Sequence, residues 1–222
     1  MINQQEIVRD VFAFGGSAGG LEALIAVFER LPPGFPATVC VALHRSPVDS
    51  THLVWILGRH CPLPVVEPGP GDSVQSGHVY VAPRDFHMTL SGTRWRLDRG
   101  PKQHRMRPAI DPLLTSVAVA HGPRVVGVLV SGGGEDGVRG LIAIKARGGL
   151  SLVQRPDEAR HPSMPSHAIG EDDVDAALSA EDIAMLLPML AAGRSVGVRG
   201  LSGSVKTRNS AAPSAAPARA RT

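Results

Sequence analysis

The sequence predicts an α/β fold with a doubly wound, mostly parallel sheet, because short apolar runs alternate with helix-like segments. Four apolar runs end in loop signals and are typical of buried parallel strands: residues 7–14, 38–43, 125–130 and 150–153. Helix-like segments follow these runs or lie between them: residues 21–31, about 49–59, 112–121 and 138–147. Gly148 and Gly149 end the last of these helices, as glycines commonly do at a helix C-terminus.

Two further patterns indicate a β-hairpin and a final helix. Residues 78–82 and 85–98 alternate partly between apolar and polar side chains, and Ser91-Gly92 separates the two arms of the hairpin. Ser179 is followed three residues later by Asp182, ahead of the apolar residues 183–190. This spacing is a helix-capping signal, so we expect a helix there.

Length and composition predict one folded domain with a basic tail. A chain of 222 residues with 43% hydrophobic content can bury one substantial core, which we place in residues 1–193. Residues 194–222 are rich in Gly, Ser, Ala, Pro and Arg and are expected to be disordered. They hold the excess of positive charge, because residues 1–193 carry 17 basic and 20 acidic residues. With 4% aromatics and no basic stripe, the folded part is not expected to bind nucleic acid.

The expected location is the cytoplasm. The N-terminus lacks the basic start and apolar core of a signal peptide, and no stretch approaches the ~20 apolar residues needed to cross a bilayer, so no membrane insertion is expected. Cys40 and Cys61 form no C-x-x-C or metal-ligand pattern, which favours a reduced setting, although the sequence alone leaves a single disulfide open.

A glycine-rich turn places Ser17 between the first strand and the first helix. Residues 15–19, Gly-Gly-Ser-Ala-Gly, match the G-x-S-x-G elbow, in which small neighbours allow a sharp turn and leave the hydroxyl exposed at a helix N-terminus. A plain structural turn and a phosphate-binding loop are the alternatives. Ser17 occupies the second-glycine position of a G-x-G-x-x-G motif, and no Gly-Lys-Ser/Thr follows, so a nucleophile is favoured.

Two other predicted strands also end in residues that serine hydrolysis requires. His44 follows the strand over residues 38–43, and Asp136 lies in the loop after residues 125–130. Because ligands bind outside the carboxyl ends of strands in open α/β sheets, these side chains are expected to converge with Ser17. His44 would act as general base and Asp136 would orient the imidazole and stabilise its cation. The glycine-rich loop 131–137 suits a backbone oxyanion donor opposite the N–H of Ala18.

Each residue also has a structural interpretation. Asp136 could cap the helix that follows it, and a strand-end histidine is often a packed or hydrogen-bonded residue. The nine histidines form no His-x-x-x-His pair or Cys/His cluster with metal-ligand spacing, so no metal and no cofactor are expected.

With these motifs the chain resembles the catalytic domain of the CheB-type chemotaxis methylesterases, over about residues 8–192. The matching segments are Gly-Gly-Ser-Ala-Gly-Gly (15–20), His44 with Pro47, Gly77-His78-Val79-Tyr80-Val81-Ala82-Pro83, His87-Met88, Arg107-Pro108-Ala109-Ile110-Asp111, residues 132–137 and Met164-Pro165. Proteins of this family remove methyl groups from receptor glutamates and also deamidate receptor glutamines.

The resemblance implies a three-layer α/β/α sandwich in which Ser17, His44 and Asp136 form a triad. It also implies an oxyanion hole made by the N–H groups of Ala18 and Gly133. The order Ser, His, Asp differs from that of α/β-hydrolases, where the acid precedes the histidine. A protein of that second class would use His161 or His167, which is the weaker alternative.

The sequence departs from the family pattern beside two of these residues. Leu43 and Arg45 flank His44 where glutamine and methionine are common, and Gly133 and Glu135 replace a common methionine and asparagine. The departures spare the triad but change the charge and space beside it. Three further residues are expected next to the substrate: Arg107, Asp111 and Met164.

We therefore expect a cytosolic, cofactor-free serine esterase that removes methyl groups from glutamates in the helical cytoplasmic region of methyl-accepting chemotaxis receptors. Only a few residues precede the first strand, so we expect a stand-alone esterase domain without the receiver domain that the family usually carries. Activity is then constitutive or controlled by a separate regulatory protein. A catalytically silent partner-binding module and a nucleotide-binding module are the rival interpretations, and the second lacks an acidic ribose partner at the proper spacing.

Overall fold

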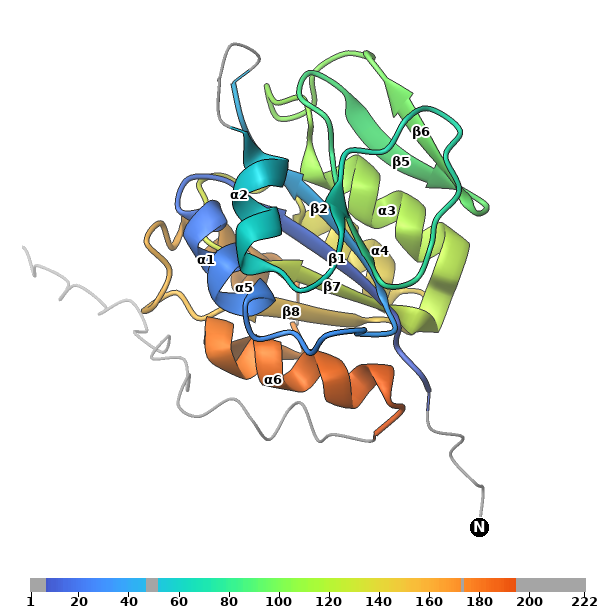
Figure 1. The fold of residues 1–222 in the computed structure, drawn as a ribbon. Helices are drawn as coiled ribbons and strands as arrows, with labels where there is room; N and C mark the ends of the chain where they lie inside the picture. Colours follow the sequence, from blue (N-terminus) through green and yellow to red (C-terminus); the bar gives the residue numbers. More distant parts are fainter. Residues whose placement is uncertain (1–6, 47–51, 173, 195–222) are drawn as a thin grey trace, which may run out of the picture.

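The computed structural model describes residues 7–46, 52–172 and 174–194. Its main sheet is built from β1 Val11–Gly16, β2 Thr38–Leu43, β3 Val65–Val66, β4 His78–Val81, β7 Val125–Leu129, β8 Leu150–Gln154 and β9 Ala176–Leu178. These seven strands lie in the order β3-β4-β2-β1-β7-β8-β9, and every pairing between them is parallel. Figure 1 labels the central strands β2, β1, β7 and β8. The expected doubly wound sheet is therefore confirmed.

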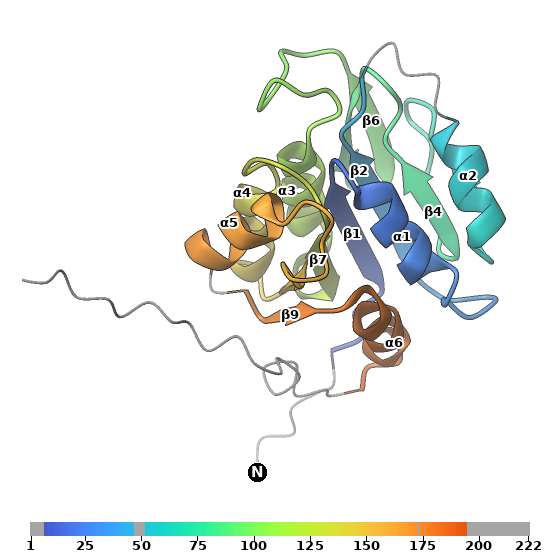
Figure 2. The same ribbon diagram turned by 90° about the vertical axis from the view of Figure 1, so that its left-hand side faces the viewer.

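Helices cover both faces of the sheet and make three layers (Figure 2). One face carries α1 Gly20–Phe28, α2 Leu53–His60 and α6 Ala180–Ala191. The other face carries α3 Ile110–His121, which a short 3-10 turn follows, α4 Val138–Lys145 and α5 Ser163–Glu171. Alternate residues of β1 serve the two layers, since Phe12 and Phe14 pack on the first face and Val11 and Ala13 on the second. A strand buried on both faces explains why its sequence is apolar throughout.

An antiparallel hairpin extends the second layer. It consists of β5 His87–Ser91 and β6 Arg94–Asp98, with Leu90 opposite Trp95. Trp95 is fully buried against Tyr80, and the Leu90 N–H donates to Ser116 Oγ of α3 at 2.9 Å. The hairpin and its Ser91-Gly92 turn agree with the expectation for residues 85–98. Residues 78–81, which we grouped with the hairpin, instead form β4 and pair in parallel with β2 and β3 in the main sheet.

Some expected boundaries are confirmed and others are shifted by a few residues. β2 has the expected bounds, and the Asp182 N–H donates to Ser179 Oγ at 2.9 Å at the start of α6, as the capping signal predicted. The first strand begins at Val11 and not at residue 7, because the side chains of Ile7 and Val8 are about half exposed and gain no packing layer. Cys40 and Cys61 are free thiols.

Part of the expected organisation lies outside the described residues. This holds for the start of the expected helix at residues 49–51 and for the tail beyond Arg194. Among the described helices, none combines the length and the apolar character required to cross a lipid bilayer.

The winding of the sheet creates a crevice beside β1. From β1 the chain continues on one side through β2 and on the other side, later in the sequence, through β7. The carboxyl ends of these three strands lie next to one another at the point where the winding changes direction, which is where open α/β sheets bind ligands.

Candidate active site

Ser17 lies in the tight turn between β1 and α1. Its N–H donates to Ser131 O at 3.0 Å, and the Gly20 N–H donates to Ser17 O at 2.9 Å. Gly19, with φ of 73°, lies in the left-handed region that favours glycine, and a Cβ there would approach Ser131 Oγ to 2.6 Å. The turn therefore fixes Ser17 at the N-terminus of α1 with its side chain partly exposed.

His44 lies beside Ser17 because β1 and β2 are parallel neighbours. Gly16 and Leu43 are register partners, and the next residues in each strand are Ser17 and His44. The His44 N–H donates to Gly16 O at 3.0 Å, which anchors the backbone of the histidine to the serine turn. Among the described contacts no hydrogen bond joins the Ser17 hydroxyl to the imidazole, but both residues line one cavity. Catalytic hydrogen bonds are often long without substrate.

The His44 imidazole is bonded to Asp136. His44 Nε2 lies 2.7 Å from Asp136 Oδ2, and both side chains are almost completely buried, with 6% and 2% exposure. The carboxylate accepts this hydrogen bond, so Nε2 carries the proton and Nδ1 keeps its lone pair. The free nitrogen of His44 is thus the one available to a nucleophile.

Asp136 also accepts two backbone hydrogen bonds from the first turn of α3. The Ile110 N–H donates to Oδ2 at 2.8 Å and the Asp111 N–H donates to Oδ1 at 2.9 Å. Burial raises the pKa of the Asp136 carboxyl, but the hydrogen bonds from His44, Ile110 and Asp111 outweigh burial and lower the pKa below its usual value. These hydrogen bonds therefore favour the ionised form of Asp136.

Asp111 makes the reciprocal contacts to α4. Its Oδ1 accepts from the Gly137 N–H at 3.0 Å and from the Gly140 N–H at 2.8 Å. Asp136, just before α4, thus caps α3, while Asp111, in α3, caps α4. Burial raises the pKa of Asp111 and the charge of Asp136 adds to this effect, with partial compensation by the Gly140 N–H and by His104.

Two backbone amides near Ser17 have no hydrogen-bond acceptor among the described residues. The N–H groups of Ala18 and Gly133 donate to no protein acceptor in the described part of the chain. Ala18 is exposed after Ser17, and Gly133 lines the cavity in the loop that follows β7. Both amides are therefore available to a developing oxyanion.

The cavity itself has a volume of about 430 Å³. Its lining residues come from three strand ends, from the connection between β6 and α3 and from α5: Ser17, His44, His104, Arg105, Met106, Gly133, Gly134, Glu135, Asp136 and His167. His167 is exposed, and its Nδ1 bonds within α5 to Ser163 O at 2.8 Å. His44, and not His161 or His167, is the histidine bonded to Asp136.

The residues expected beside the substrate lie behind the cavity wall. Arg107 donates to Asp85 and to the carbonyl oxygens of Arg99 and Gly100, and it does not line the cavity. Met164 is fully buried and packs under Gly132. Arg107, Asp111 and Met164 each hold a neighbouring loop and do not line the cavity themselves, so their expected place next to the substrate stays a prediction.

The two charged residues that depart from the family pattern, Glu135 and Arg45, lie in different places relative to the cavity. Glu135 lies on the rim of the cavity with 58% of its side chain exposed, and its Oε1 is 3.8 Å from His104 Nδ1. Arg45 donates to Glu67 at 2.5 Å and to Ala82 O at 2.8 Å, and its side chain borders a separate hollow of about 500 Å³ beside α2. Arg45 is therefore turned away from the catalytic cavity.

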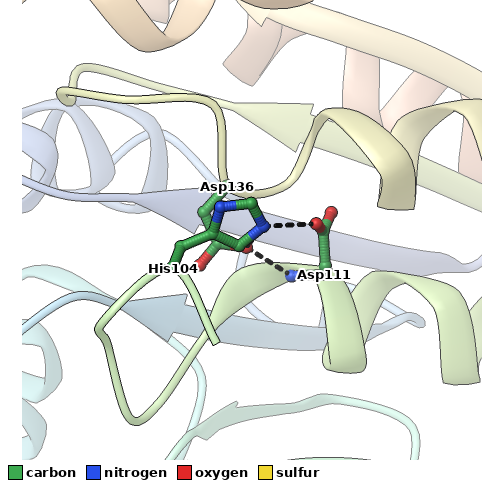
Figure 3. A group of neighbouring side chains, drawn as sticks. All are labelled: His104, Asp111 and Asp136. Atoms are coloured by element: carbon green, nitrogen blue, oxygen red, sulfur yellow. Dashed lines mark hydrogen bonds and ion pairs between the residues drawn. The ribbon is translucent and has the colours of Figure 1, made fainter. Parts of the chain in front are cut away.

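Three side chains come close enough together to be considered as metal ligands. In the described ranges, ligand atoms of His104, Asp111 and Asp136 lie within 4.8 Å of one another (Figure 3). Most of the carboxylate oxygens are already occupied, since Asp136 accepts from His44 and two amides, and Asp111 Oδ1 accepts from two amides. The remaining pair, His104 Nε2 and Asp111 Oδ2, bond to each other at 3.2 Å. The donor set thus fits a hydrogen-bonded network better than a metal centre.

The fold and the side chains at its edge define a class: a three-layer α/β protein that gathers a serine, a histidine and an aspartate, the residue types of a serine hydrolase, at the carboxyl ends of its central strands. Comparison with known proteins narrows this class. Residues 12–187 match the CheB methylesterase family. The chain belongs to the CheB methylesterase family.

Individual relatives support the same family. A protein-glutamate methylesterase/protein-glutamine glutaminase of Pyrococcus abyssi is 35% identical over 179 residues, which are 79% of this chain and 49% of that protein. A protein of the same description from Xanthomonas campestris pv. campestris is 40% identical over 153 residues, or 67% of this chain and 42% of that protein. The chain thus spans about half the length of the curated relatives it matches.

The fold has a close counterpart among solved structures. The crystal structure of the Thermotoga maritima CheB methylesterase catalytic domain superimposes with a TM-score of 0.79 at 30% identity, and the match covers 83% of this chain and 100% of that chain. The three-layer architecture implied by the sequence resemblance is confirmed by this match.

Proposed function

We propose that the chain is a protein-glutamate methylesterase that uses Ser17, His44 and Asp136 as a catalytic triad and needs no cofactor. The observation that carries the proposal is the 2.7 Å contact between His44 Nε2 and Asp136 Oδ2, one strand away from the Ser17 turn. The domain that carries this activity is residues 1–193, and residues 194–222 are a tail.

The reaction follows from the arrangement of the groups. Ser17 Oγ attacks the ester carbonyl carbon while His44 Nδ1 takes the hydroxyl proton, and Asp136 stabilises the imidazolium. The N–H groups of Ala18 and Gly133 hold the oxyanion. Collapse of the tetrahedral intermediate breaks the bond to the methoxy oxygen, which leaves as methanol with the proton from His44. Water then hydrolyses the acyl-Ser17 intermediate to a glutamate carboxylate, and an amide substrate would release ammonia by the same steps.

The proposed substrates are glutamate methyl esters in the helical cytoplasmic region of chemotaxis receptors, which places the protein in the cytoplasm. An open rim suits this substrate, because an ester on a helix surface cannot enter a deep pocket. Methylesterase and glutaminase are the descriptions of the relatives, and the receptor as target is our extension to this chain.

Methanol release from a methylated receptor tests the proposal. Ser17→Ala is expected to lower kcat by roughly 10⁴-fold or more, because loss of the nucleophile removes the whole triad pathway. Ser91→Ala, at an exposed serine of the hairpin, is the matched control and should release methanol at the wild-type rate. Undiminished release by Ser17→Ala would refute the proposal, and absence of release by the wild-type chain would favour a catalytically silent module.

A further inference from the structure

The connection between β6 and α3, residues 99–109, brings a second imidazole to the catalytic carboxylate. We call this segment the β6–α3 strap. His104 Nε2 lies 3.2 Å from Asp111 Oδ2 and 4.0 Å from Asp136 Oδ1, while His44 bonds to Oδ2 of Asp136. Figure 3 shows the His104 ring at the strap, pointing toward Asp111 with Asp136 beside it. The proposed triad histidine and His104 thus share one aspartate.

The carboxylate pair needs a counter-charge. Asp111 and Asp136 are both buried, with 6% and 1% exposure, and lie close enough for the charge of one to raise the pKa of the other. Backbone amides at the two helix N-termini offset part of this repulsion. His104 is the side chain that approaches both carboxylates from the solvent side, with 25% exposure.

The strap holds His104 in this place at a conformational cost. Gln103 and Met106 exchange backbone hydrogen bonds of 3.2 and 2.8 Å, so His104 and Arg105 are the two central residues of a tight turn. Both have positive φ, 48° and 63°, where side chains other than glycine cost on the order of 1 kcal/mol each. Such strain persists only where surrounding contacts hold it. Four hydrogen bonds from Arg107 to Asp85, Arg99 O and Gly100 O fix the base of the strap.

We propose that His104 is a positioning residue that holds the Asp111–Asp136 pair in place and, as a cation, opposes protonation of His44 through the shared Asp136. The inference rests on the proposed function of His44 as general base. His44 must be neutral to accept the Ser17 proton, so a positive charge at His104 extends activity toward lower pH. The charged and titratable groups that face His104 are Asp111 of α3, Glu135 and Asp136 of the β7–α4 loop, and, in the same cavity, His44, Arg105 and His167.

Two substitutions separate charge from turn structure. His104→Asn removes the imidazole but tolerates the left-handed conformation, so the turn should persist. His104→Lys keeps a positive charge at the same place. The measurements are the pH dependence of kcat/KM for methanol release and, independently of turnover, the NMR titration of the His44 ring.

In His104→Asn, the acid limb of kcat/KM and the midpoint of the His44 titration should both move to higher pH by about half a unit. At pH values below the midpoint, this shift corresponds to an about threefold loss of kcat/KM. At pH values where both imidazoles are neutral in the wild type, the rates should converge. His104→Lys should return both midpoints to the wild-type position or below.

A uniform loss at every pH, with an unmoved His44 titration, would overturn the inference and leave His104 a merely structural residue. The NMR titration also distinguishes the two proposals. If the wild-type chain released no methanol but His44 still shifted in His104→Asn, the coupling would stand and the methylesterase proposal would fail.

Discussion

The two glycine-rich loops of the site differ in how tightly they are packed. In the loop of residues 15–20, a Cβ on any of the four glycines would clash, at 2.3 Å from Ile110 for Gly15 and 2.6 Å from Ser131 for Gly19. In the loop of residues 132–137, a Cβ on Gly133 or Gly134 would meet no atom within 4 Å. Sterics thus fix the loop that carries Ser17, whereas the middle of the loop before Asp136 is open to the cavity.

The comparison explains where this chain departs from its family. The crowded loop keeps the family pattern Gly-Gly-Ser-Ala-Gly-Gly, while the open loop has Gly133 where methionine is common. The ends of the open loop are still constrained, because a Cβ on Gly132 would lie 2.9 Å from Ser17 Cβ and Gly137 has φ of 97°. Within these two loops, the departures from the family pattern therefore fall at positions that line the cavity, and the triad residues are unchanged.

The largest expected effect comes from filling the crowded loop. Gly15→Ala should lower the free energy of unfolding by about 2 kcal/mol, because its methyl group overlaps Ile110 and Leu129 in the core. Activity should fall as well, since Ile110 donates to Asp136. Urea denaturation measures the stability change. Gly58→Ala is the control: Gly58 is exposed in α2 with no atom near its Cβ position, and alanine there should stabilise the helix by up to about 1 kcal/mol. Equal effects of the two substitutions would contradict the packing difference.

A smaller effect is expected from filling the open loop. Gly133→Met should change the free energy of unfolding by less than about 0.5 kcal/mol, because space is free and the backbone needs no positive φ. KM should change several-fold, as the side chain enters the cavity rim. Gly134→Met is the matched control, since its φ of 82° should cost about 1 kcal/mol despite the same free space. A large loss of stability in Gly133→Met would show that the loop is not open.

The sequence predicted the parts of the fold that depend on local patterns. β2, β7 and β8, the hairpin and the cap of α6 lie close to where apolar runs, turn residues and the Ser179 signal placed them. The sequence did not predict β3 and β9, because strands of two or three residues are too short to show an alternating hydrophobic pattern. The sequence did not predict α5, because Pro165 and Gly170 are poor helix formers within this nine-residue helix.

In the site, too, the residues that follow local sequence patterns were predicted, and those that depend on tertiary placement were not. Ser17 and His44 directly follow strands, so their meeting follows from sheet winding, and Asp136 was expected in the next strand-end loop. His104 could not be found in this way, because a tight turn in the β6–α3 strap brings it to the carboxylates and no motif marks it. The reciprocal capping of α3 and α4 by Asp136 and Asp111 also depends on tertiary placement. This reciprocal capping explains why Asp136 fits both the interpretation as a helix cap and the interpretation as the carboxylate of the triad.

The central claim is that His44 and Asp136 act as one unit on Ser17. The most direct measurement is kcat/KM for methanol release by His44→Ala, by Asp136→Asn and by the double variant, with folding checked by circular dichroism. If the two residues act together, the double variant should be no slower than His44→Ala, because an orienting carboxylate has no effect without its imidazole. Losses that multiply in the double variant would contradict the account.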